Sequence, residues 1–222
     1  MIEANSREIQ SNQTDIHEHL ETIVLRHLEH QFLKPISEHT QREFDHLNDL
    51  VQKNNYPVVL DSCCGVGEST AKIAEKHPDA LVIGLDKSAH RLSKNEYHTV
   101  NNNYELARVD LNDFWRLAQQ ADWNISHHYL LYPNPWPKSK HVQRRWHGAA
   151  VFPSLVALGG VLELRSNWSI YLKEFAFALK ILGKSSEIEP LNITEPLTPF
   201  ERKYQQSGHQ LWRLSADLCI KK

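Results

Sequence analysis

The chain has 222 residues, of which 41% are hydrophobic, so it can bury a substantial core as one globular domain with an appendage. Its formal net charge of −2 gives no global basic field, and a polyanionic partner would have to meet a local patch. Three cysteines, two of them adjacent (Cys63 and Cys64), make no disulfide framework and favour a reducing compartment, the cytoplasm. No stretch approaches the roughly 18 apolar residues of a membrane span, so we expect no membrane partner.

Residues 1–55 form a region of their own. Apolar residues recur at helical spacing from Ile16 to Leu28, and Thr40 with Glu43 resembles a capping box ahead of a second apolar series. We expect two amphipathic helices on a disordered tip, as an N-terminal helical extension. Histidines are frequent here, but no cysteine or convincing acidic partner accompanies them, which favours solvated helix faces over a metal site.

Residues 56–222 show short apolar runs that alternate with helical segments. One predicted helix ends near Pro78, and another has an apolar face from Trp168 to Leu182. Strands that alternate with helices indicate an α/β domain with a mostly parallel sheet, covered by helices on both faces. The expected strands are 58–60, 81–85, 104–109, 128–132, 161–164 and 212–218.

A glycine turn joins the first strand to its helix. Gly65 and Gly67 let the backbone turn tightly and let a ligand approach the loop. Asp86 follows the second strand, where a carboxylate can accept hydrogen bonds from ribose hydroxyls. The pattern of a dinucleotide site would require a third glycine where Thr70 stands, and Asp61 ahead of the loop would repel a pyrophosphate. A negative loop instead suits a cationic nucleoside, S-adenosyl-L-methionine.

Asp110, at the end of the third strand, is expected to contact the adenine or to fix its loop. For each of the acids Asp61, Asp86 and Asp110, a helix cap or a solvated carboxylate is the alternative to a binding role. Three acids that end three consecutive strands around one glycine turn favour the binding role for the set.

A stiff loop with three prolines, from Pro133 to Pro137, follows the fourth strand. A basic segment comes next, and Trp136 and Trp146 lie within and beside it. Cations contact phosphates and aromatic rings stack on unpaired bases, so the segment predicts a nucleic-acid surface in place of an ordinary solvated face. Its permanent charges are Lys138, Lys140, Arg144 and Arg145.

Four separated blocks, in consistent order, resemble the tRNA (guanine-N7)-methyltransferase family. The resemblance runs from about Val58 to Leu218 and leaves the N-terminal helices uncovered. The blocks are the glycine loop after the first strand, Pro133-Asn134-Pro135-Trp136-Pro137-Lys138 with the basic segment, Gly159-Gly160 with Ser166-Asn167-Trp168, and Thr198-Pro199-Phe200-Glu201-Arg202 with Gly208-His209 and Leu211-Trp212.

The resemblance implies a Rossmann-like class I methyltransferase with a seven-stranded sheet, which binds S-adenosyl-L-methionine and tRNA and needs no metal. The resemblance does not distinguish a monomer from a homodimer. Asn134 takes the catalytic position, where the methyl donor meets the base. The implied cofactor-binding residues are Asp61, Gly65, Gly67, Asp86, Lys87, Asp110 and Asn134. The implied substrate-binding residues are Lys138, Arg144, Arg145, Asn167, Thr198, Phe200 and Glu201.

Five positions depart from the family pattern. Asn134 stands where the family usually has Asp, and Ser166-Asn167 stands where it has Thr-Asp. Asp61 stands for Glu, and Cys63 stands for the first Gly. Guanine N7 carries an in-plane lone pair, so its methylation needs alignment more than a general base. Two alternatives remain: a methyltransferase for exocyclic amines, which often carries Asn-Pro-Pro-Tyr at this strand end, and a catalytically weak RNA-binding relative that retains cofactor affinity.

Overall fold

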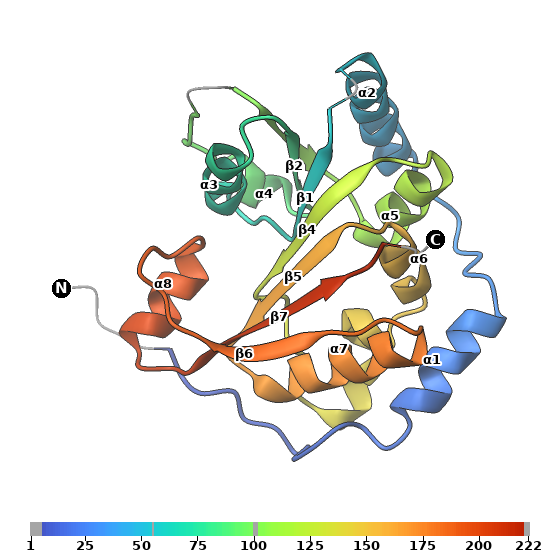
Figure 1. Cartoon of the computed structure of the whole chain (residues 1–222), viewed down its shortest axis with the longest axis vertical. Coiled ribbons are helices and arrows are strands. Elements are labelled where there is room, and N and C mark those ends of the chain that lie inside the picture. The colour runs from blue at the N-terminus through green and yellow to red at the C-terminus, as the bar shows by residue number, and fades with distance from the viewer. Residues whose placement is uncertain (1–5, 55, 100–101, 220–222) are drawn as a thin grey trace.

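The computed structural model describes residues 6–54, 56–99 and 102–219 of the chain. The strands are β1 (Val58–Ser62), β2 (Leu81–Asp86), β3 (Tyr104–Arg108), β4 (Ile125–Leu131), β5 (Val161–Ser166), β6 (Glu187–Leu191) and β7 (Leu211–Asp217). They form a seven-stranded sheet in the order β3-β2-β1-β4-β5-β7-β6 (Figure 1). β7 pairs antiparallel with β5 and β6, and the remaining pairs are parallel.

Helices cover both faces of this sheet. They are α1 (Leu20–Glu29), α2 (Glu38–Asn54), α3 (Glu68–Lys76), α4 (Ala89–Leu92), α5 (Leu111–Gln120), α6 (Phe152–Ala157), α7 (Ser169–Ile181) and α8 (Pro199–Gln206), with 3-10 turns at Ser139–Arg144 and Trp146–Gly148. Figure 1 shows α3, α4 and α8 on one side of the sheet and α5, α6 and α7 on the other, where α1 and α2 also lie. This confirms the predicted fold class. In the described ranges, no helix combines the length and apolarity that a bilayer crossing requires.

The predicted strands overlap β1 to β5 and β7. β1 and β2 are buried almost throughout, as expected for parallel strands with both faces covered. β6 was not predicted as a strand. Its Glu187, Glu189 and Pro190 provide no apolar run, and its side chains lie at the exposed edge of the sheet. Proline and charge are typical of an edge strand, where they discourage pairing with another chain.

The N-terminal helices share the core of the α/β domain. Leu20 and Val24 of α1 are buried in the same apolar cluster as α7, and Phe44 of α2 is stacked on Trp123 with ring centroids 5.2 Å apart. The proposed boundary between an extension (1–55) and the α/β domain (56–222) therefore does not separate two cores.

The predicted capping box at Thr40 is wrong. α2 already begins at Glu38, and Thr40 lies buried in its first turn. The Thr40 hydroxyl oxygen accepts a hydrogen bond from the backbone N–H of Asp110 at 3.1 Å, so it joins α2 to the end of β3. The helix start is instead preceded by Ser37, whose N–H and hydroxyl donate to Asp113 of α5 at 3.0 and 2.8 Å.

The expected disordered tip falls partly on residues 1–5, which lie outside the described residues. Residues 6–17, here called the N-terminal arm, are extended along one edge of the molecule from α8 towards α1 (Figure 1). The arm is hydrogen-bonded to the body of the protein, for example from the Ser11 hydroxyl to the Pro137 carbonyl at 2.6 Å. For residues 6–17, the expectation of disorder is wrong.

In the sheet, β2 and β3 lie on one side of β1, and β4 and β5 lie on its other side. At such a switch point the connections on the two sides diverge, which opens a crevice at the carboxyl ends of the strands. The glycine loop after β1 and the proline loop after β4 both lie at this edge. The topology thus brings together the two segments that the sequence marked as functional.

Close packing of α3 on the sheet comes from an unexpected glycine. A Cβ at Gly84 of β2 would lie 2.3 Å from the Thr70 hydroxyl and 2.5 Å from Leu106, so only glycine fits there. In a dinucleotide fold, the third glycine of the loop serves this purpose on the helix. Here Thr70 takes that position on α3, and Gly84 of β2 provides the space for its side chain.

Candidate functional site

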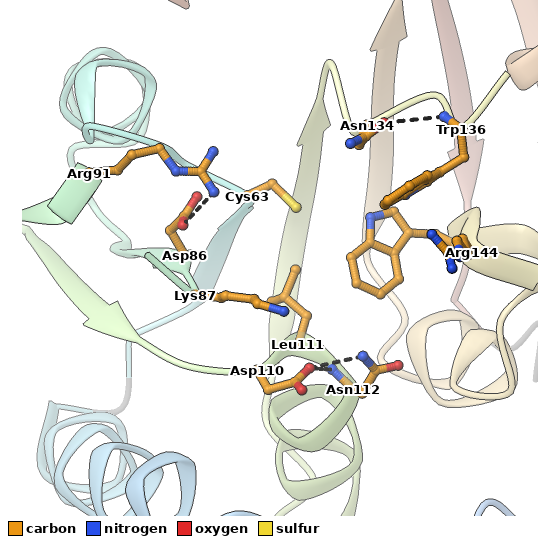
Figure 2. Close-up of a pocket in the computed structure, with 11 residues that line it drawn as sticks. Cys63, Asp86, Lys87, Arg91, Asp110, Leu111, Asn112, Asn134, Trp136 and Arg144 are labelled. Carbon is orange, nitrogen blue, oxygen red and sulfur yellow. Dashed lines mark hydrogen bonds and ion pairs between the residues drawn. The ribbon is translucent and has the colours of Figure 1, made fainter. Parts of the chain in front are cut away.

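A cavity of about 210 Å³ lies at the switch point. Figure 2 shows its walls: Asp86 and Arg91 on one side, Trp136 and Arg144 on the other, and Asp110 with Asn112 at the base. The cavity joins the end of β2 to the loop after β4. Its lining residues are Cys63, Asp86, Lys87, Arg91, Asp110, Leu111, Asn112, Asn134, Trp136, Arg144 and Trp146.

Asp86 is held rigidly at the carboxyl end of β2. Its side chain is 2% exposed, and its Oδ2 accepts a hydrogen bond from the Gly65 N–H at 3.1 Å. Its Oδ1 accepts from the Ser88 N–H at 2.7 Å and pairs with the Arg91 guanidinium at 3.0 Å. The carboxylate therefore links the glycine loop to the turn after β2, and it faces the cavity from a fixed position (Figure 2).

Asp110 both caps α5 and lines the cavity. Its Oδ1 accepts from the backbone and side-chain N–H groups of Asn112 at 2.9 Å, and Lys34 reaches its Oδ2 at 3.0 Å. Burial raises the pKa of Asp110, but the hydrogen bonds from Asn112 and Lys34 outweigh this effect and lower it overall. Lys34 belongs to the segment between α1 and α2, so the N-terminal region braces this end of the cavity.

Asp61 lies outside the cavity wall. It is 1% exposed, and its Oδ2 accepts hydrogen bonds from the hydroxyls of Ser69 and Thr70 at 2.6 and 2.7 Å. Its Oδ1 is buried and has no hydrogen-bond partner among the described residues. Burial raises the pKa of Asp61, the hydroxyls of Ser69 and Thr70 lower it, and the charge of nearby Asp86 raises it, which together bring it to about 6. Asp61 is thus a buried group beneath the first turn of α3, and its direct contact with the cofactor stays a prediction.

The two loop glycines have different functions. Gly65 has φ +64° and open space around it, so it permits the turn and presents its N–H to Asp86. Gly67 has φ +82°, and a Cβ there would lie 2.5 Å from the Asn95 amide and 2.8 Å from Leu106. Gly67 therefore allows Asn95 and Leu106 to pack closely beside the loop, and its contact with a ligand stays a prediction.

The loop after β4 contains two strained residues. Tyr132 and Trp136 have φ of 51° and 45°, a left-handed region that is costly for residues with a Cβ. The Asn134 Oδ1 accepts a hydrogen bond from the Trp136 N–H at 3.2 Å, which closes a tight turn over Pro135. Asn134 is exposed at the cavity edge, and its amide nitrogen points towards the cavity (Figure 2).

The basic segment divides into an exposed and a buried part. Lys138, Lys140 and Arg144 are exposed, and the Arg144 guanidinium lies 4.8 Å from the Trp136 ring centroid. Slight desolvation and the neighbouring cations lower the pKa of His141. The segment therefore concentrates permanent positive charge beside the cavity.

The prediction that Arg145 contacts phosphates is wrong. Arg145 is 0% exposed and pairs with the Glu174 carboxylate at 2.5 Å. Its guanidinium also donates to the Trp136 carbonyl at 3.2 and 3.1 Å and lies 4.9 Å from the Trp168 ring centroid. The sequence could not separate Arg144 from Arg145, because the 3-10 turn ends at Arg144 and the extended Arg145 that follows directs its side chain elsewhere.

The predicted substrate residues of α8 are mostly structural. Thr198 caps the helix by accepting the Glu201 N–H at 2.9 Å. The Glu201 carboxylate is 0% exposed and accepts hydrogen bonds from the Leu197 N–H and from the Tyr132 hydroxyl at 2.6 and 2.7 Å. Arg165 pairs with Glu201 at 2.8 Å. The prediction that Thr198 and Glu201 hold the nucleoside is therefore corrected: they fix α8 and the start of the loop.

Two further predicted residues remain accessible on the same side. Phe200 is 51% exposed beside Tyr204, and Asn167 lies after β5, where its amide is 3.1 Å from His209 Nδ1. Neither lines the cavity, so both stay predictions for a neighbouring surface.

Sequence reasoning missed several cavity residues, of which Cys63 is the most informative. It has φ 69° in place of the family's glycine, and its side chain lies on the wall. Burial raises the pKa of the Cys63 thiol to about 12, so it is an uncharged, space-filling group. The departure from glycine was the signal that could have identified it. In the described part of the chain, no three His, Cys, Asp or Glu side chains are grouped as metal ligands.

Comparisons with known proteins identify the family of the chain. A family model described as "Putative methyltransferase" matches residues 55–214. The tRNA (guanine-N(7)-)-methyltransferase of Pseudoalteromonas atlantica is 31% identical over 180 residues, which cover 71% of each chain. The chain belongs to the tRNA (guanine-N7)-methyltransferase family. The protein of the same name from Mannheimia succiniciproducens is 27% identical over 192 residues, or 80% of this chain and 75% of that protein.

A solved structure places the fold among methyltransferases as well. A mutant 16S rRNA (adenine(1408)-N(1))-methyltransferase from Catenulisporales acidiphilia, crystallised with SAM, superposes with a TM-score of 0.58 at 14% identity. The match covers 79% of this chain and 93% of that chain. At this identity the likeness shows the shared fold.

The raised pKa of Asp61 leads to a prediction about stability. The folded state binds the Asp61 proton more tightly than the unfolded chain does. The protonated carboxyl therefore contributes to the free energy of unfolding below the ordinary pKa of 3.8, and this contribution is lost as pH rises through about 6. Asp61→Asn keeps an acceptor for Ser69 and Thr70 and should abolish the loss. Urea unfolding of the parent, of Asp61→Asn and of the exposed control Asp79→Asn across this pH range measures the effect. Parallel profiles for the parent and Asp61→Asn would contradict it.

Proposed function

We propose that this protein transfers the methyl group of S-adenosyl-L-methionine to N7 of guanine in tRNA. One observation carries the proposal: in a chain of this family, a single cavity joins Asp86 at the end of β2 to Asn134 at the end of β4. When bound, S-adenosyl-L-methionine supplies an electrophilic methyl group on a cationic sulfur. Every protein contribution then consists of binding and alignment.

The distribution of charge fits such a ligand pair. The carboxylates of Asp61 and Asp86 are buried behind and beside the glycine loop, and the Asp61 Oδ1 has no hydrogen-bond partner in the described ranges. The cations Lys87, Arg91 and Arg144 are exposed around the same cavity. Buried negative charge favours a cationic nucleoside at depth, and exposed positive charge favours a polyanion outside. Asp86, Lys87, Asp110 and Asn134 are the residues that we assign to the cofactor.

The loop fixes the orientation of the Asn134 amide. A backbone N–H can only donate, so the Asn134 atom that meets the Trp136 N–H must be the amide oxygen. The amide then presents its N–H₂ group to the cavity.

The partner of the exposed basic surface is proposed to be tRNA. Lys138 and Arg144 lie on the accessible side of the loop, and Phe200 and Asn167 extend the surface towards α8. The three free thiols agree with a reducing cytoplasm. The proposal is compatible with a monomer and with a homodimer.

The adjacent arginines provide a test of the RNA surface. Arg144→Ala should weaken tRNA binding and lower the log–log salt slope by about 1, because one phosphate contact is lost. Its unfolding midpoint should match that of the parent. Arg145→Ala should instead lower the free energy of unfolding by about 3–5 kcal/mol, because the buried carboxylate of Glu174 loses its permanently charged partner. An unchanged salt slope in Arg144→Ala would place the RNA surface elsewhere.

The reaction itself is tested with the full chain, methyl-labelled S-adenosyl-L-methionine and total tRNA. The expected product after nucleoside digestion is 7-methylguanosine. Label on an exocyclic amine would overturn the assignment of N7. Cofactor and tRNA binding without any transfer would identify a catalytically weak RNA-binding relative.

Asn134 is the position at which the chemistry departs from the family. Asn134→Asp keeps one oxygen for the Trp136 N–H and adds a second acceptor. Because charge-assisted hydrogen bonds are about twice as strong as neutral ones, the single-turnover rate of Asn134→Asp should be preserved or raised. Asn134→Ala frees the Trp136 N–H and should lower the rate about tenfold or more. Cofactor affinity is measured in parallel by calorimetry. A large loss in Asn134→Asp at intact cofactor affinity, or equal rates for all three proteins, would contradict this role.

A further inference from the structure

The N-terminal arm lies against the loop that carries Asn134. At its start, the Ser6 N–H donates to the Ser207 hydroxyl at 3.2 Å, and the Ser6 carbonyl is 3.1 Å from His209 Nε2 after α8. At its end, the His17 N–H donates to Glu174 of α7 at 3.0 Å. The arm is therefore attached at both ends, and the loop lies between these attachments.

The middle of the arm holds the loop on both sides of Lys138. The Ser11 hydroxyl donates to the Pro137 carbonyl at 2.6 Å. The Asn12 Oδ1 accepts the Ser139 N–H at 3.0 Å. Pro133, Pro135 and Pro137 have no N–H of their own, so the loop forms few backbone hydrogen bonds and depends on groups from elsewhere.

A buried network lies beneath these contacts. Gln13 donates through Nε2 to Glu174 at 2.6 Å and accepts through Oε1 from Arg145 at 3.1 Å. Glu174 also pairs with Arg145 at 2.5 Å and with His147 at 2.9 Å, and these three charged or polar side chains are 0% exposed. Burial raises the pKa of Glu174, but hydrogen bonds and charge from His147 and Arg145 lower it to about 2. Gln13 thus completes a group of side chains that would be costly to leave unpaired.

This network ends on the strained residue of the loop. Arg145 donates to the carbonyls of Trp136 and Lys138, while Trp136 keeps its left-handed φ of 45°. Strained backbone of this kind costs about 1–3 kcal/mol and persists only where its surroundings over-determine it. The Trp136 N–H in turn holds the Asn134 oxygen. The contacts run without interruption from Gln13 through Arg145 and Trp136 to Asn134.

We propose that residues 11–13 of the N-terminal arm are positioning residues for methyl transfer, because they hold the Asn134 loop in its strained conformation. This inference rests on the proposed function. The arm touches the loop on the side of Arg145 and Glu174, so it acts on alignment and leaves the cofactor residues Asp86 and Asp110 untouched. An arm that only stabilised the fold would change unfolding without changing the rate of the bound complex.

Asn12 gives the sharpest test, because it is exposed and its substitution leaves the buried network intact. Asn12→Ala removes the acceptor for the Ser139 N–H, whereas Asn12→Asp retains an oxygen there. Ser11→Ala and Ser11→Thr form a second pair that removes or retains the hydroxyl. Thr14→Ala, an exposed arm residue, is the matched control.

The full-length variants are compared in single-turnover methyl transfer to saturating tRNA, with tRNA affinity, cofactor affinity and thermal unfolding measured alongside. Small misplacements at a reacting centre cost large factors in rate, so we expect the double variant Ser11→Ala/Asn12→Ala to lose about tenfold or more in maximal rate. Its affinities for tRNA and for the cofactor should stay within about threefold of the parent. Asn12→Asp, Ser11→Thr and Thr14→Ala should match the parent.

Two outcomes would overturn the inference. Weaker tRNA binding at an unchanged maximal rate would make the arm part of the RNA surface, and an unchanged rate and affinity would make it structural. A parent protein without transferase activity would instead refute the proposed function. The two failures are therefore distinguishable.

Discussion

The buried carboxylate of Glu174 imposes the strongest constraint on this structure. A charge without access to water must be paired and hydrogen-bonded, and the partners of Glu174 come from two segments distant in sequence. Gln13 and the His17 N–H belong to the N-terminal arm, and Arg145 and His147 follow the proline loop. One requirement of electrostatics thus fixes the arm, the loop and α7 relative to one another, and the position of Asn134 depends on all three.

The site has two halves that the N-terminal region braces separately. On the cofactor side, Lys34 and Ser37 contact Asp110 and Asp113, which begin α5. On the substrate side, the arm holds the loop at Pro137 and Ser139. These braces lie outside residues 55–214, which the family model matches.

The polar residues of the glycine loop and α8 show how a motif can serve structure and chemistry together. Asp61 supports the first turn of α3 and places charge behind the cavity. Glu201 joins α8 to Tyr132 at the start of the strained loop. Neither side chain lines the cavity, yet each controls the position of a segment that does. A motif residue therefore influences the site through the backbone that it holds.

The sequence by itself predicted six of the seven strands, the flanking helices and the edge at which the cavity lies, because apolar periodicity and turn residues are local signals. It also singled out Asp86, Asp110 and Asn134, which lie at or just beyond the ends of β2, β3 and β4 and line the cavity. Only the tertiary structure decided which of Arg144 and Arg145 faces solvent, that Gly67 serves packing, and that residues 6–17 hold the loop. Those outcomes depend on contacts between residues far apart in the chain, such as Gln13 with Glu174, and on burial, which no local pattern encodes.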